Sequence, residues 1–140
     1  MSKTEILPDG IIIPSSTDYL AEVDRHLEEK FLQAGIDPSI VTDIAISVSE
    51  LVNNAILHGN GSDISKMVEV RFSITPNELR VVITDQGEGF NVDRVENPVD
   101  DVNLLKEVGR GIYIVKNFVD DLIVSRGSSG GTRVEIVKKL

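Results

Sequence analysis

The segment formed by residues 49–59 brings a carboxylate and two amides together at a spacing that could support chemistry. Glu50 and Asn54 are four positions apart, so in a helix that turns by about 100° per residue they stack on one face. A carboxylate there could accept the proton of a reacting hydroxyl while the amide oxygen binds a metal ion. The solvated face of an amphipathic helix has the same pattern, and this segment alone leaves both interpretations open.

A second candidate is the segment Asp85-Gln86-Gly87-Glu88-Gly89, which directly follows an expected strand. Two glycines at a strand end let the backbone approach a ligand that side chains would keep away. Asp85, as a buried acceptor, could take a hydrogen bond from an exocyclic amine such as that of adenine. The alternative is a plain turn that begins with an aspartate.

Glycines also precede an expected helix in the segment Gly109-Arg110-Gly111. Such glycines expose backbone N–H groups to an anion, and the helix dipole favours phosphate at that end. Residues 91–108, just before them, carry five acidic side chains and little periodicity, which is typical of a functional loop or lid. A helix start that merely tolerates glycine explains the same residues.

Neither histidine is predicted to carry the chemistry. His26 could be a phosphoacceptor, but nothing around it supplies a second helix for a phosphotransfer bundle, so we expect a solvated helix residue. His58 could be a ligand, but it precedes Gly59, where favourable charge and capping at a helix C-terminus explain it.

The helices that must position these residues follow from the hydrophobic periodicity. Two long helices are expected at residues 16–34 and 38–58, with N-caps at Ser15 or Ser16 and at Asp37. The second helix ends at Gly59 and buries one broad apolar face, made of Val41, Ile44, Val48, Leu51, Val52 and Ala55.

Strands are expected in five places. They are an edge segment within 4–14 that breaks near Pro8-Asp9-Gly10, then 68–74, 79–84, 122–125 and 132–137, with a hairpin loop at 127–131. A third amphipathic helix is expected at 112–119.

Composition restricts the class of protein. The 140 residues, 41% of them hydrophobic and 26% charged, fit a single soluble domain over 1–140. The absence of cysteine excludes a disulfide framework and thiolate chemistry. A net charge of −9 argues against direct binding of nucleic acid and leaves room for a basic protein partner. With no signal-peptide pattern and no apolar run of about 20 residues, we expect a cytoplasmic protein without a membrane span.

Four motifs in order carry a resemblance to a known family. They are Glu50-Leu51-x-x-Asn54-Ala55-x-x-His58-Gly59, Asp85-x-Gly87-x-Gly89-Phe90, Gly109-Arg110-Gly111 and Gly130-Gly131-Thr132. Each motif alone is unspecific, but together they resemble the N, G1, G2 and final Gly-Thr motifs of the GHKL ATP-binding superfamily. The small size and the residues around the third motif are similar to the anti-sigma factor serine kinases of bacterial partner-switching systems.

The resemblance implies a role for each matching residue on the helix and the sheet. Glu50 matches the catalytic base that activates a serine or threonine hydroxyl, and Asn54 matches the Mg²⁺ ligand. Asp85 matches the adenine acceptor, and Gly87 allows close approach to the base. Thr132 matches a position that contacts adenine through water.

The resemblance also implies roles around the expected lid. Gly89 would flex with the lid, while Gly109 and Gly111 would bring backbone N–H groups to the phosphates. Some relatives carry a basic residue just before the first lid glycine, where this chain has Glu107 and Val108. Lys106 and Arg110 are the nearest candidates for the cation, and the choice between them stays open.

The implied fold is an α/β two-layer sandwich, a mixed and mainly antiparallel sheet of about five strands covered on one face by three helices. The implied function is an ATP-dependent serine/threonine kinase that binds a sigma factor and phosphorylates a STAS-domain antagonist, as a homodimer. Two alternatives stay open: a switch kinase for a STAS scaffold without a sigma partner, and a non-catalytic ATP-gated binding module. ATP or ADP and Mg²⁺ are the expected ligands.

Overall fold

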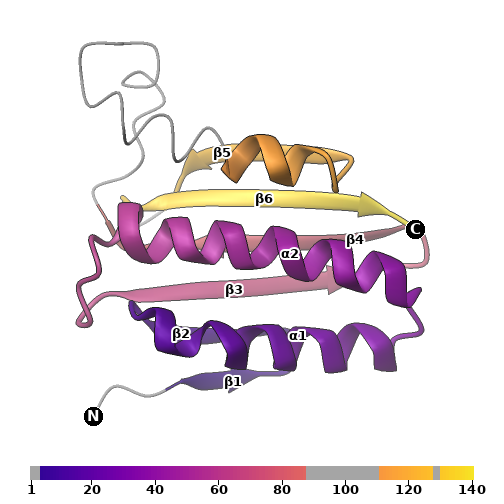
Figure 1. Ribbon diagram of the computed structural model, residues 1–140, viewed down its shortest axis with the longest axis horizontal. Helices are drawn as coiled ribbons and strands as arrows, with labels where there is room; N and C mark the ends of the chain where they lie inside the picture. The colour runs from indigo at the N-terminus through magenta and orange to yellow at the C-terminus, as the bar shows by residue number, and fades with distance from the viewer. Residues whose placement is uncertain (1–3, 88–110, 128–129) are drawn as a thin grey trace.

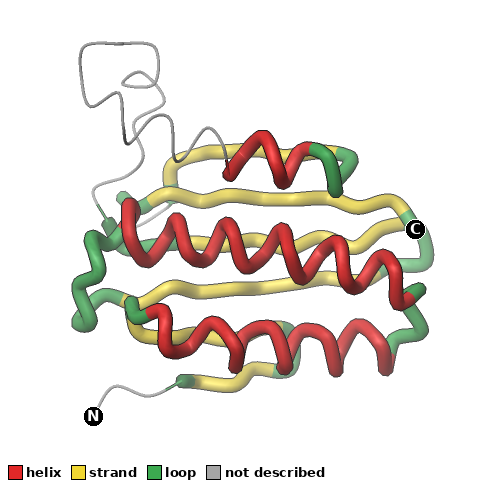
Figure 2. The backbone as a smooth tube through the Cα atoms, viewed as in Figure 1, coloured by secondary structure: helices red, strands yellow, loops and turns green. Residues whose placement is uncertain are grey.

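A computed structural model describes residues 4–87, 111–127 and 130–140 of the chain. They form two layers, a twisted sheet and a layer of helices that lies against one face of it (Figures 1 and 2). The strands are β1 (Glu5–Leu7), β2 (Gly10–Pro14), β3 (Met67–Ile74), β4 (Glu78–Thr84), β5 (Asp121–Arg126) and β6 (Thr132–Lys139). The helices are α1 (Leu20–Gln33), α2 (Pro38–Asn54) and a short third helix over residues 111–116.

The sheet has the strand order β1-β2-β3-β4-β6-β5, and each neighbouring pair is antiparallel. The last strand in sequence, β6, is therefore inserted between β4 and β5. The predicted two-layer sandwich is confirmed, with one strand more than the five expected. The edge segment forms a hairpin in which Leu7 pairs with Gly10, because Pro8 cannot donate to a strand ladder and Gly10 accommodates the turn.

The core lies between the two long helices, α1 and α2, and the helix-facing side of the sheet (Figure 1). The alternation predicted for the two strands is present throughout β4, where every second side chain is buried, and in the first half of β3, where Val68 and Val70 are buried. All six of the residues predicted for the buried apolar face are in the core: Val41, Ile44, Val48, Leu51 and Val52 on α2, and Ala55 directly after its end. The run Pro38–Gly59 is long and apolar enough to cross a membrane by composition alone, but this buried stripe identifies it as a core helix.

The predicted start of the second helix is confirmed. Asp37 is the N-cap of α2 and accepts a hydrogen bond from the Ser39 N–H at 2.8 Å, with Pro38 as the first helical residue. The start of the first helix differs slightly, because Ser16 caps a 3₁₀ turn over Thr17–Tyr19 that precedes α1.

The end of the second helix also differs from the prediction. The regular α-helical hydrogen bonding stops at Asn54 and continues as one π-helical turn over Ala55–Gly59, closed by a bond from Asn60 N–H to Ala55 O of 2.8 Å. π turns are rare and occur often at functional sites, because they rotate the following residues relative to a regular helix. The third helix ends at residue 116, three residues before the predicted end.

The prediction of a solvated His26 is wrong. His26 is only 8% exposed, and its Nε2 lies 3.3 Å from the Leu7 carbonyl oxygen. It follows Val23 by three positions and precedes Leu27, so it belongs to the buried stripe of α1. The carbonyl of the β1–β2 hairpin supplies the polar partner that a buried imidazole needs.

Candidate active site

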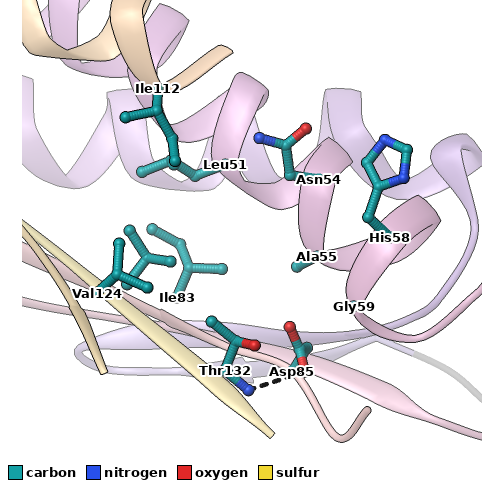
Figure 3. A pocket seen from close by; sticks show the side chains of 11 residues that line it. Leu51, Asn54, Ala55, His58, Gly59, Ile83, Asp85, Ile112, Val124 and Thr132 are labelled. Carbon is teal, nitrogen blue, oxygen red and sulfur yellow. Dashed lines mark hydrogen bonds between the residues drawn. The ribbon is translucent and has the colours of Figure 1, made fainter. Parts of the chain in front are cut away.

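A pocket lies between the C-terminal half of α2 and the sheet, and it is partly open to solvent. Asn54, Ala55 and His58 approach it from the helix side, and Asp85 and Thr132 from the sheet side (Figure 3). The remaining lining residues are mainly apolar: Leu51, Gly59, Ile83, Ile112, Val124 and Val134.

Asp85 is the polar group at the sheet side of this pocket. It is 3% exposed, and its Oδ1 accepts hydrogen bonds from the backbone N–H groups of Gly87 and Thr132, both at 3.0 Å. The backbone therefore fixes one carboxylate oxygen, while the other, Oδ2, lies against Gly59 at the pocket wall. Figure 3 shows the carboxylate directed towards the helix side. An oriented acceptor of this kind suits an amine donor on a ligand.

Three glycines from distant parts of the chain pack around this carboxylate. A Cβ atom on Gly59 would overlap the Asp85 side chain, one on Gly87 would overlap the Gly59 carbonyl, and one on Gly131 would overlap the Asp85 carbonyl. Only glycine allows these backbones to approach so closely. The sequence predicted close approach at Gly87. It assigned Gly59 to the helix end and Gly131 to a hairpin loop, and it placed both in the family motifs without predicting their contact with Asp85.

Glu50 and Asn54, both on α2, lie against Gly111 of the third helix. A Cβ on Gly111 would be 3.1 Å from Asn54 Nδ2 and 3.3 Å from Glu50 Oε2, so the bare glycine fits against both side chains. Both polar residues are half-buried, and Gly111 is buried. The structure thus brings Glu50 and Asn54 together, as the helical spacing predicted, and it places Gly111 against both. Their catalytic and binding roles stay predictions.

The other predicted site residues divide into two groups. Thr132 lines the pocket and donates its backbone N–H to Asp85. Gly89, Gly109 and Arg110 lie outside the described residues, as does Lys106, so their predicted roles are not tested. His58 was expected to act only at the helix end, yet it lines the pocket from the π turn. Its spacing of four positions from Asn54 was the signal for this placement.

The site offers few ligands for a metal ion. Among the described residues no group of three or more His, Cys, Asp or Glu side chains could hold one. The Asn54 amide, which lines the pocket one helical turn from the Glu50 carboxylate, is a hard oxygen donor. Such a sparse set suits Mg²⁺, which keeps several waters and takes other ligands from substrate phosphates.

A polar contact between α1 and α2 supports the helix that carries Glu50. The Ser49 hydroxyl donates to both carboxylate oxygens of Asp24, at 3.0 and 3.1 Å. Burial raises the pKa of the Asp24 carboxyl above its ordinary value of 3.8; the Ser49 hydrogen bond opposes this rise, and repulsion from Glu28 adds to it. The folded state therefore binds this proton more tightly than the unfolded state.

We expect Asp24→Asn to raise the free energy of unfolding modestly at pH 7. The contribution of Asp24 to stability is fully present below pH 3.8 and is lost as the pH rises through the raised pKa of the folded state. An asparagine can still accept from Ser49 without carrying the charge. Urea unfolding at several pH values should therefore show the advantage of the variant shrinking as the pH falls.

The control for this experiment is Asp121→Asn, which removes a charge from an exposed strand end. Its difference from wild type should lack the pH dependence found for Asp24→Asn. If Asp24→Asn is less stable than wild type across the whole pH range, the ionised carboxylate stabilises the contact and our interpretation is wrong.

Comparison with known proteins places this chain in a family. Residues 13–138 match the model of the histidine kinase-like ATPase domain. The serine-protein kinase RsbW of Staphylococcus epidermidis is 28% identical over 134 residues, which cover 90% of this chain and 82% of the relative. The anti-sigma F factor of Clostridium perfringens is 35% identical over 134 residues, which cover 94% of this chain and 88% of the relative.

Solved structures agree on the fold. The RsbU and RsbW domains of a Mycobacterium tuberculosis protein match 99% of this chain and 32% of that one, with a TM-score of 0.67 and 20% identity. The histidine kinase domain of a blue-light activated kinase from Erythrobacter litoralis matches 91% of this chain and 62% of that one, with a TM-score of 0.58 and 26% identity. The chain therefore belongs to the histidine kinase-like ATPase (GHKL) family, in its branch of anti-sigma factor serine/threonine protein kinases.

Proposed function

We propose that this protein transfers the γ-phosphate of ATP to a serine or threonine of a STAS-domain antagonist and, in another state, binds a sigma factor. One arrangement carries the proposal. A fixed carboxylate acceptor, Asp85, lies on the sheet side of a pocket whose helix side carries Asn54. Glu50 lies one helical turn before Asn54 on α2. Nucleotide use itself follows from membership of the ATPase family.

In this proposal adenine occupies the apolar part of the pocket. Its exocyclic amine donates to Asp85, whose Oδ1 is already occupied by two backbone N–H groups. Ile83, Val124 and Val134 form apolar walls for the ring. The buried carboxylate would reject guanine, because guanine presents a carbonyl where adenine presents an amine.

The phosphates then extend towards Asn54 and Glu50. The Asn54 amide oxygen would hold Mg²⁺, which offsets the phosphate charge when it is bound. Glu50 accepts the proton of the substrate hydroxyl while the hydroxyl oxygen forms a bond to the γ-phosphorus. The bond between the γ-phosphorus and the bridging oxygen breaks, and ADP is released. Gly111 leaves both side chains room for these contacts.

The partners follow from the relatives' names and the resemblance. One relative is named for kinase activity on serine and another for inhibition of a sigma factor. We propose the same two activities here, in a cytoplasmic homodimer that binds neither nucleic acid nor membrane. A switch kinase for a STAS scaffold needs the same chemistry, and only the partner distinguishes it. A non-catalytic binding module is disfavoured because Glu50 lies close to Asn54, which lines the pocket.

The deciding experiment is transfer of labelled γ-phosphate, with Mg²⁺, to a STAS-domain protein of the same organism. We expect label on a serine or threonine, and none when Mg²⁺ is removed by a chelator. Co-purification of a sigma subunit with the unphosphorylated system would separate the anti-sigma role from the scaffold alternative. Tight ATP binding without transfer to any STAS protein would contradict the kinase and favour the binding module.

A further inference from the structure

Asn60 is a buried polar residue that the proposed chemistry does not use. It follows the π turn directly and is 3% exposed. Its Nδ2 donates to Ser15 Oγ at 2.8 Å and to the Met67 carbonyl at 3.0 Å. Its Oδ1 accepts from the Gln86 backbone N–H at 2.8 Å. One side chain thus connects three segments that are far apart in the sequence.

These bonds replace part of the sheet. The β3–β4 ladder ends where Glu69 pairs with Thr84, although Val68 and Met67 of β3 still pair with β2. The Met67 N–H then donates to the Gln86 side-chain Oε1 at 2.7 Å, while the Gln86 N–H donates to Asn60. Side chains therefore satisfy backbone groups that the ladder no longer pairs.

The same bonds hold the two walls of the pocket against each other. Gly59 precedes Asn60, and Gly87 follows Gln86. The Gly59 carbonyl lies so close to Gly87 that a side chain there would overlap it. Gly87 in turn donates to Asp85 Oδ1. A change at Asn60 would loosen this contact and with it the direction of the Asp85 carboxylate.

We infer that Asn60, acting through Gln86, is a positioning residue that orients Asp85 for the adenine amine. The inference rests on the proposed function, because it concerns the same pocket. It differs from a purely structural role in one respect. The effect of Asn60 on nucleotide affinity must pass through Asp85, whereas its effect on stability does not.

The first test measures the Kd of ATP and of ADP by calorimetry. Asn60→Ala should weaken both nucleotides by about tenfold, the size of one hydrogen bond, and by the same factor, because adenine is common to both. Ser15→Ala is the matched control. It removes two bonds of the same network, from Asn60 Nδ2 and to the Lys66 carbonyl, on the side away from Gln86, so it should lower the melting temperature while both Kd values stay within about twofold.

A second variant keeps the test valid if Asn60→Ala folds poorly. Gln86 is exposed, so Gln86→Leu should fold and still weaken ATP, whereas Gln86→Glu, which keeps the acceptor for Met67 N–H, should bind close to wild type. In an Asp85→Asn background, Gln86→Leu and Asn60→Ala should add little to the loss of affinity, since residues that act through one contact are not additive.

Two results would overturn the inference. The first is an ATP affinity within about twofold of wild type in both Asn60→Ala and Gln86→Leu, whatever their melting temperatures. The second is a loss of affinity that is fully additive with Asp85→Asn. If the wild-type protein itself binds no ATP, the proposed function fails and this inference fails with it, and that outcome is distinct from the other two.

Discussion

Replacing Glu50 with glutamine should reduce phosphoryl transfer by about 10²- to 10⁴-fold, the usual contribution of a general base. Glutamine keeps the size of the side chain beside Asn54 and Gly111, but its amide cannot accept the hydroxyl proton. Nucleotide binding should change little, because Glu50 is not among the residues that line the pocket. The measurement is single-turnover transfer of labelled phosphate to the STAS protein at saturating ATP, with the Kd of ATP determined separately.

Glu29→Gln is the matched control for this variant. It makes the same change of charge on the exposed surface of α1, so it should retain the full transfer rate. Transfer by Glu50→Gln within about threefold of wild type would exclude Glu50 as the base. A parallel loss of ATP binding would show instead that Glu50 holds the nucleotide or its metal.

Asp85→Asn should weaken ATP by roughly 10- to 100-fold, the cost of one hydrogen bond to a charged group. The amide oxygen can still accept from Gly87 and Thr132, whose N–H groups bond Oδ1 in the wild type. The NH₂ of the asparagine amide then takes the place of Oδ2, so two donors face each other where the exocyclic amine of adenine would bind. The fold should be retained. The ratio of the Kd of GTP to the Kd of ATP, measured for both proteins, should be smaller for the variant than for wild type.

Asp63→Asn tests whether the turn geometry alone explains the effect. Asp63 Oδ1 accepts from the backbone N–H two residues later, at Ser65, just as Asp85 Oδ1 accepts from Gly87. Asp63 is exposed and does not line the pocket. Unchanged ATP binding in Asp63→Asn and in Asp85→Asn alike would place the adenine elsewhere.

Local patterns predicted the parts of this site that depend on neighbours in sequence. The four-residue spacing of Glu50 and Asn54 was sufficient to place them together, because a helix fixes that geometry. Strand alternation predicted which face of β3 and β4 is buried, and the residues after β4 predicted the position of Asp85 at a strand end.

The missed features depend on contacts between distant segments. Gly59 and Gly131 each exclude a side chain only because the fold brings their backbones against Asp85. Asn60 resembles an ordinary loop residue until residues 15, 67 and 86 surround it. His26 is buried because the β1–β2 hairpin reaches α1. No periodicity in the sequence encodes such long-range contacts.

The position of β6 has a consequence for how the protein is made. This strand is synthesised after the others of the described sheet, yet it lies between β4 and β5 and supplies the Thr132 N–H that holds Asp85. A nascent chain on the ribosome can form the hairpins of the first four strands, but β4 keeps an open edge and Asp85 lacks one of its two donors. Long-range strand insertion of this kind is a slow step in folding. The pocket is thus completed only when β6 has emerged, so under the proposed function ATP binding would require synthesis to reach the end of this sheet.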